Sequence, residues 1–401
     1  MRDGSMLPAP VPGGTATGGR LMLGAALLMV SFNMRPAVTS LGPVLPEVMR
    51  GTGMTTAVAS LLTTLPALCF GLSAPLAPSI ARRFGIERTL LAMMLALAAG
   101  TLLRWAEASA ALFAAAILSG AAIGVVNVLL PALLKRDFPD RVALMTGLYT
   151  MALSAGAAGA SGSSAPLALR LGSWGESLAL WALPALLAAF ALVPVLPLDF
   201  RPAAPRRLPS LWRNGLAWRV TLLMGFQSST TYCAFGWLSP ILRDRGMSPV
   251  AAGLVLSLSV LVQVVATLSG APFAQLFRDQ RLPAVLTLTV GTIGFLGCLT
   301  LPLPLVWGAA VVMGLGQGSV FSITLLIVVL RAPDTATAAQ LSGMAQAVGY
   351  VIAAAAPFVL GVAHQLTGDW RAAAPLLVLY TAIGIAAAAG AGRNRLVRPP
   401  G

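Results

Sequence analysis

Apolar stretches of about 20 residues recur along almost the whole sequence, and they constrain the fold more than any other feature. A helix needs about 20 predominantly apolar residues to cross a bilayer core of ~30 Å. Only 9% of the 401 residues are charged, whereas a soluble domain carries about 25%. Strands of a membrane barrel would alternate apolar and polar residues, but these runs are continuous and rich in Leu, Ala and Gly. The sequence therefore predicts an all-α membrane protein.

Twelve transmembrane helices are expected, arranged as two bundles of six. A segment rich in proline and arginine, "DFRPAAPRRLPSLWRN" (199–214), separates the bundles. We expect a disordered tail at 1–20, a first bundle at 21–198, a linker at 199–216, a second bundle at 217–392 and a tail at 393–401. The expected spans are 21–49, 55–80, 88–105, 109–135, 141–169 and 176–197 in the first bundle, and 217–242, 249–276, 283–301, 304–331, 336–365 and 371–392 in the second.

The two bundles resemble each other in sequence. "SGAAIGVVNVLLPALLKRDFPD" (119–140) aligns with "MGLGQGSVFSITLLIVVLRAPD" (313–334), so that Gly120 falls on Gly314 and Gly124 on Gly318. Other short matches occur in the same order at nearly the same offset. Self-similarity of this kind indicates an internal duplication, and the bundles are therefore expected to be related by pseudo-symmetry.

The positive charges follow the expected topology. If the loops are numbered alternately across the membrane, 19 of the 26 Lys and Arg residues lie on the side of the N-terminus and six on the other, which leaves Arg35. An excess of Lys and Arg marks the cytoplasmic side, so both termini are expected in the cytoplasm of a bacterial-type inner membrane. This distribution explains the net charge of +14 without a nucleic-acid partner.

Arg35 lies at the midpoint of the first span, ~20 Å from either end at a rise of 1.5 Å per residue. A charge at this depth costs a few kcal/mol and usually faces a partner or a wet cavity. Of the twelve acidic residues, all but Glu47 lie in loops or at span edges, and Glu47 is ~18 Å from Arg35 along the helix. We therefore interpret Arg35 as the contact for an anionic substrate, because a guanidinium donates two parallel hydrogen bonds to a carboxylate-like group.

Two other interpretations of Arg35 remain open: it contacts backbone carbonyls at a turn broken by Pro36, or it lies nearer the membrane surface. Pro36 removes a backbone hydrogen bond in mid-span, and broken helices are tolerated where they line a cavity. In duplicated transporters, broken helices point to a central site between the repeats.

Uncharged polar side chains in the middle of other spans are further candidates for substrate binding. Each can donate a hydrogen bond to a small anion, and each is equally suited to holding helices together. Glu47, near the outer end of its span, is the acidic side chain placed to titrate during transport. We expect no metal site at the lone His364, near a span end, and no cofactor. The polar candidates are Asn127, Tyr149, Gln227, Tyr232, Gln263 and Gln346.

The twelve spans in two halves, the linker and the shared side of the termini resemble the major facilitator superfamily. More narrowly, "NMRPAVTSLGPVLPE" (33–47), "GVVNVLLPALLKRDFPDR" (124–141) and "GMAQAVGYVIAAAAPF" (343–358) resemble the cyanate and nitroimidazole permease family. This resemblance implies that Arg35 contacts the anion, with Asn33, Asn127 and Gln346 at matching positions. In the loop "PSIARRFGIER" (78–88), Arg82 stands where the superfamily usually has an acidic residue.

The sequence as a whole predicts a secondary active or facilitative transporter of a small anion that works by alternating access. It is expected to act as a monomer in the lipid bilayer on a small-molecule substrate. An exporter of drug-like or neutral molecules is the alternative within the same fold. An enzyme is not expected, because no cluster of His, Cys or acidic residues lies inside a span. A receptor or scaffold fits a duplicated chain with a broken first helix less well.

Overall fold

The computed structural model describes residues 16–198 and 210–397, and all regular elements in these ranges are helical. Six helical passages make up the N-terminal half, residues 16–198. Several passages are interrupted, so one passage can contain more than one helix. The passages are α1 (Ala16–Asn33) with α2 (Pro36–Thr39) and α3 (Leu41–Thr52), α4 (Thr56–Ser73) with η1 (Ala74–Leu76) and α5 (Ala77–Phe84), α6 (Ile86–Leu102) with η2 (Leu103–Ala106), α7 (Ser109–Asp137), α8 (Val142–Leu171), and α9 (Trp174–Ala179) with α10 (Ala182–Leu192) and η4 (Val193–Leu198).

Six further passages make up the C-terminal half, residues 210–397. A short turn of 3₁₀ helix, η5 (Leu211–Arg213), precedes the first of them. The passages are α11 (Gly215–Asp244), α12 (Pro249–Gln275), α13 (Arg281–Thr300), η6 (Leu303–Leu305) with α14 (Val306–Arg331), α15 (Thr335–Thr367), and η7 (Trp370–Ala372) with α16 (Ala373–Ala391). The twelve passages confirm the predicted all-α fold. Most of the two expected tails and of the linker lies outside the described residues, and α1 already begins within the expected N-terminal tail.

Among the described residues, ten helical segments are long and apolar enough to cross a membrane by length and composition. The passages missing from this group are α8 and α11. Each has 30 residues, which corresponds to about 45 Å of helix, so both are long enough to cross. Both helices line the cavity described below.

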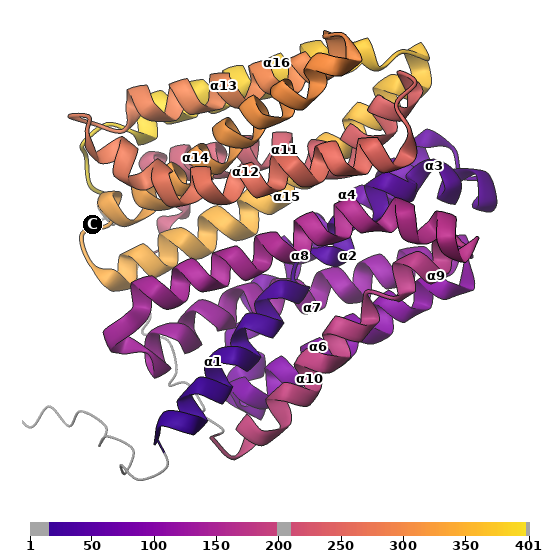
Figure 1. Ribbon diagram of the computed structural model, residues 1–401. Coiled ribbons are helices and arrows are strands. Elements are labelled where there is room, and N and C mark those ends of the chain that lie inside the picture. The colour runs from indigo at the N-terminus through magenta and orange to yellow at the C-terminus, as the bar shows by residue number, and fades with distance from the viewer. Residues whose placement is uncertain (1–15, 199–209, 398–401) are drawn as a thin grey trace, which may run out of the picture.

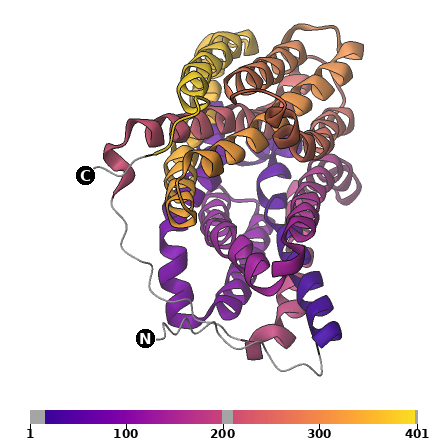
Figure 2. The same cartoon turned by 90° about the vertical axis from the view of Figure 1, so that its left-hand side faces the viewer.

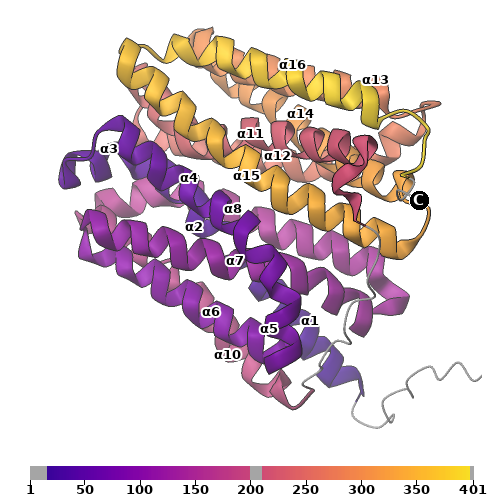
Figure 3. The same cartoon turned by 180° about the vertical axis from the view of Figure 1, so that it is seen from behind.

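The two halves lie side by side with their helices running in roughly the same direction (Figure 1). The view rotated by a quarter turn is more nearly along the helices, and in it the purple N-terminal half is distinct from the orange C-terminal half (Figure 2). The halves meet mainly through α4 against α15 and α8 against α12, and the view from behind shows α4 next to α15 (Figure 3). We call the end with the loop after α3 the Glu47 end, and the opposite end the Arg331 end.

The first passage is broken at its middle. Helix α1 stops at Asn33, Arg35 takes the position before α2, and Pro36 is the first residue of α2. Because proline has no N–H, the carbonyl of Phe32 loses its helical partner. A second interruption follows at Ser40, before α3. The predicted break at Pro36 is thus present, and it places the Arg35 backbone at a gap in the helix.

Helix α8 packs against this break through a glycine. A methyl group built on Gly156 would lie 1.9 Å from the carbonyl oxygen of Phe32, far inside contact distance. The side chain of Thr39 also donates to the carbonyl oxygen of Ala157, at 3.1 Å. The break therefore needs a helix surface without a side chain at residue 156, and α8 supports the geometry that presents Arg35.

We expect Gly156→Ala to destabilise the protein, because the added methyl group pushes α8 away from the break. Overpacking of this kind costs about 1–3 kcal/mol and is measured as a lower unfolding temperature in detergent. Gly147→Ala on the same helix is the control, since no atom lies within 4 Å of a methyl group at that position. Equal unfolding temperatures for the two variants would contradict this role of Gly156.

Candidate substrate site between the two halves

A cavity of about 80 Å³ lies at the level of the break, between the two halves. The N-terminal half contributes residues from the break and from α8. The C-terminal half contributes residues from α11, α12, α14 and α15. The side chains with hydrogen-bonding groups that line it are Arg35, Thr150, Ser154, Gln227, Ser228, Thr231, Tyr232, Gln263, Thr267, Gln317 and Tyr350.

Arg35 carries the only formal charge in the lining of this cavity. Its Nη1 donates to the hydroxyl oxygen of Tyr232 on α11 at 3.3 Å, and its guanidinium lies 5.9 Å from the ring centre of Phe235. No described acidic residue lies within ion-pair distance of it. Neither the tyrosine hydroxyl nor the aromatic ring neutralises the positive charge, so the guanidinium remains a strong site for an anion.

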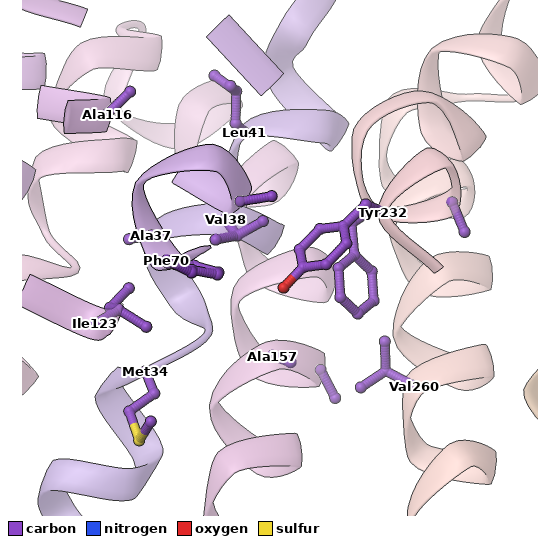
Figure 4. Packing of buried hydrophobic residues seen from close by; sticks show 14 of the residues in the cluster. Met34, Ala37, Val38, Leu41, Phe70, Ala116, Ile123, Ala157, Tyr232 and Val260 are labelled. Carbon is purple, nitrogen blue, oxygen red and sulfur yellow. The ribbon is translucent and has the colours of Figure 1, made fainter. Parts of the chain in front are cut away.

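Aromatic rings surround the guanidinium. Tyr232 meets Phe235 and Tyr350 edge to face, with ring centres 6.0 and 6.2 Å apart. Phe70 on α4 completes the group from the N-terminal half, 6.3 Å from Tyr232. Figure 4 shows the Tyr232 side chain extending from its helix toward the segment that carries Val38. Such edge-to-face pairs hold ring orientations, so the cavity has stiff, flat walls beside Arg35.

Two glutamines lie on the C-terminal side of the same cavity. The amide nitrogen of Gln263 on α12 donates to the amide oxygen of Gln317 on α14 at 3.1 Å. Gln317 is only 3% exposed, and its own amide nitrogen has no hydrogen-bond partner. The sequence pointed to Gln263 but not to Gln317, although a single glutamine in the middle of an apolar span was the same signal in both helices.

The structure gathers four of the predicted substrate residues in the cavity lining: Arg35, Gln227, Tyr232 and Gln263. Gln227 is turned along its own helix, where its amide nitrogen donates to the Ser228 hydroxyl at 2.7 Å. Tyr149 does not line the cavity, but it lies within electrostatic reach of Arg35.

Three other predicted residues do not line the cavity. Asn33 uses its amide nitrogen to donate to the carbonyls of Met29 and Pro184, at 2.8 and 2.9 Å. These bonds hold α1 against α10, which is a packing role. Gln346 donates to Ser342 within α15, at 2.9 Å. Asn127 is partly buried on α7.

A second arginine, Arg104, supports the broken passage from behind. The charge count assigned it to the side opposite the N-terminus, at the end of the expected span 88–105, and it lies in η2 with only 4% exposure. Its two terminal nitrogens donate to the Ala37 carbonyl at 2.6 Å and to the Ser40 hydroxyl at 3.2 Å. Arg104 thus binds backbone next to the second interruption, which is the kind of contact that was left open for Arg35.

The Glu47 end is closed by an ion pair between the halves. Arg243 on α11 donates to both carboxylate oxygens of Glu47 on α3, at 2.5 and 2.6 Å, and to the carbonyl of Pro43 at 3.0 Å. Gln365 accepts from the backbone N–H of Ala57 at the same end. A two-point arginine–carboxylate pair is among the stronger polar contacts, so the Glu47–Arg243 pair is a latch across the interface.

The family model of the major facilitator superfamily matches residues 21–357. The chain belongs to the major facilitator superfamily. It is therefore a multi-pass membrane transporter and not an enzyme.

Several curated relatives of this superfamily transporter are similar over most of their length. An uncharacterized transporter, YycB of Bacillus subtilis, is 36% identical, with 92% of this chain and 93% of the relative covered. The 2-nitroimidazole transporter of Escherichia coli is also 36% identical, with 94% and 97% covered. The cyanate transport protein CynX of Escherichia coli is 31% identical, with 86% and 90% covered.

Solved structures of other transporters share the fold. The nucleoside transporter NupG matches with a TM-score of 0.74 at 13% identity, covering 92% of this chain and all of that chain. A bacterial homologue of the human lysosomal transporter Spinster matches with a TM-score of 0.73 at 14% identity, covering 96% and 99%. At these identities the match supports the arrangement of the helices alone.

We expect Glu47→Gln to loosen the Glu47 end, because the neutral amide gives up the charge-assisted bonds to Arg243. Hydrogen–deuterium exchange of residues 44–54 and 241–249 should accelerate by roughly tenfold, in line with the ~1.5–3 kcal/mol of bonds to charged groups. The exchanged pair Glu47→Arg with Arg243→Glu should restore slow exchange.

Arg50→Ala is the control for the latch. Arg50 also pairs with Glu47, at 3.1 Å, but its side chain is 72% exposed. Exposed pairs contribute little, so exchange should not change. If Glu47→Gln and Arg50→Ala have the same small effect, Glu47–Arg243 is not a latch.

Proposed function

We propose that this protein carries a small anion across the membrane by alternating access, with Arg35 as the central binding residue. The observation that carries the proposal is the uncompensated guanidinium at a mid-span helix break, facing a cavity between the two halves. An ionisable residue at this depth is expensive and is usually functional. Tyr232, Gln227 and Gln263 from the C-terminal half complete the proposed site.

The size of the cavity supports a small substrate. Sites for drug-sized ligands are typically ~300–1,000 Å³, well above the 80 Å³ between these halves. The substrates in the names of the two Escherichia coli relatives are small and rich in acceptor atoms. Cyanate is an anion, and a nitro group presents two oxygens that suit the arginine fork. An uncharged nitro compound is therefore the second candidate, in preference to a bulky drug.

In the proposed cycle, the substrate neutralises Arg35 and draws the two halves together around it. Arg35 belongs to one half, while most of the polar lining belongs to the other. A bound anion that contacts both sides makes the closed site less costly than the empty, charged one. Opening of the site toward the Glu47 end then requires the Glu47–Arg243 latch to separate. Glu47 is the proposed coupling residue, because its carboxylate must part from Arg243 each time the Glu47 end opens.

We also propose the orientation of the protein in the membrane. The Arg331 end carries most of the positive loop residues, which assigns it to the cytoplasm and places both termini there. The membrane is then the inner membrane of a bacterial-type cell. We also propose that the working unit is the monomer, since the two halves that face the cavity belong to one chain.

Arg35→Gln should abolish binding of the anion while leaving the fold intact. Uptake of radiolabelled cyanate into proteoliposomes should fall at least tenfold, because charge-assisted bonds are worth ~1.5–3 kcal/mol. Arg35→Lys keeps the charge but loses the planar fork, so it should retain part of the uptake. Arg371→Gln, at an exposed position in η7, is the control. Full uptake by a correctly folded Arg35→Gln protein would disprove the proposed site.

The coupling mode follows from the charge moved in each cycle. An uncoupled carrier moves one negative charge, so an inside-positive potential of 100 mV should concentrate the anion roughly 50-fold, from ~2.3 kcal/mol per charge. A carrier that moves one proton with each anion is electroneutral and responds to a pH gradient instead. If Glu47 couples transport to protons, Glu47→Gln should convert the second behaviour into the first.

A further inference from the structure

The amide nitrogen of Gln317 is a buried donor that the protein leaves unused. It has less than 1 Å² of exposed surface and no hydrogen-bond partner, and its residue lines the cavity that contains Arg35. Buried polar groups in native proteins are almost always paired, and an unpaired donor carries the full cost of desolvation. A donor kept unpaired in a binding cavity indicates that the ligand supplies its acceptor.

The backbone around Gln317 holds it in place. Methyl groups built on Gly314 and Gly318 would lie 2.4 Å from carbonyl oxygens of α12, and one on Gly316 would lie 2.1 Å from the backbone of Gly291 on α13. Helix α14 therefore packs directly against the backbones of α12 and α13, and no space is left for it to rotate. This packing fixes the backbone of Gln317 beside the cavity and leaves only its side-chain torsions to adjust.

The bond between the two glutamines leaves a donor and an acceptor free. With the Gln263 nitrogen on the Gln317 oxygen, the Gln317 nitrogen and the Gln263 oxygen are unused. Exchanging the positions of O and N in both amides, which such side chains allow, exchanges the two roles but still leaves one NH2 group and one oxygen without a partner. The C-terminal wall of the cavity thus always presents an amide donor.

We propose that the substrate is a flat anion with a second acceptor atom at its far end, bound between Arg35 and Gln317. This inference rests on the proposed function, since it takes Arg35 as the contact for the anionic group. The rings of Tyr232, Phe235 and Tyr350 line the same cavity and suit a planar, unsaturated ligand. Because Arg35 and Gln317 belong to different halves, only a ligand that reaches both helps the halves to close.

The experiment compares three carboxylates of nearly equal size on the purified full-length protein. Benzoate has only the anionic group, whereas nicotinate and isonicotinate replace one ring C–H by an acceptor nitrogen. Dissociation constants are measured by isothermal titration calorimetry in lipid nanodiscs. One pyridine acid should bind about three- to tenfold more tightly than benzoate, the range of a neutral hydrogen bond.

Variants separate Gln317 from Arg35. Gln317→Met keeps the length of the side chain but removes the donor, so the preference for the pyridine acid should vanish while benzoate binding stays within twofold. Thr324→Val, at a buried position of the same helix but outside the cavity lining, should preserve the preference for the pyridine acid. Unfolding temperatures check that each variant is folded.

The outcomes distinguish the two proposals. In one outcome, Arg35→Gln weakens the binding of all three acids while Gln317→Met weakens their binding equally or not at all. In that case the proposed second acceptor on the substrate is wrong, and the anion site stands. Equal binding of the three acids, or no binding of any, also overturns the flat two-ended substrate. If Arg35→Gln leaves every affinity unchanged, the anion site itself is wrong.

Discussion

An arginine held midway along the first helical passage, with no described acidic residue paired to it, is the constraint on which the rest of the structure depends. A charge within a membrane span usually faces a charged partner, backbone carbonyls or a cavity, and the two halves leave a cavity beside Arg35. The break at Pro36 serves the same purpose, because broken helices are stable only where other groups satisfy the freed backbone. Arg104 does so at Ala37, and Gly156 makes room for the Phe32 carbonyl.

The interface between the halves combines close backbone contact with a few polar bonds. Methyl groups on Gly42 and Gly71 would each lie 2.5 Å from a carbonyl oxygen of the opposite half, at Phe235 and Ala347. Such smooth surfaces pack closely without interlocking large side chains, which suits halves that rock against each other. The Glu47–Arg243 pair then supplies a specific contact that holds one end closed.

The duplicated halves have diverged where they face the cavity. At the offset that aligns Gly120 with Gly314, Gln317 corresponds to Ile123, which is buried among apolar side chains and labelled in Figure 4. The glycines that bring neighbouring helices together are shared by both halves, as at Gly124 and Gly318. The duplication thus preserved helix packing, whereas the charge lies in one half and the free amide in the other. In the proposed site, this asymmetry lets a single ligand contact both halves.

The lengths of the apolar segments and the charges of the loops between them predicted the twelve helical passages. Each span must satisfy its own backbone hydrogen bonds and bury its own apolar surface in lipid. Arg35 and Pro36 were equally visible, since a charge or a proline in mid-span has a local cost that the sequence alone reveals. The hydrogen-bond partners of the polar residues could not be predicted from the sequence. Asn33 and Gln263 look alike in the sequence, yet one holds α1 against α10 and the other lines the cavity. Only the tertiary structure made that difference, because the direction of a polar side chain depends on which helices pack around it. For the same reason, the pairing of Glu47 with Arg243, the burial of Arg104 and the unused amide of Gln317 emerged only when residues far apart in the chain were brought together.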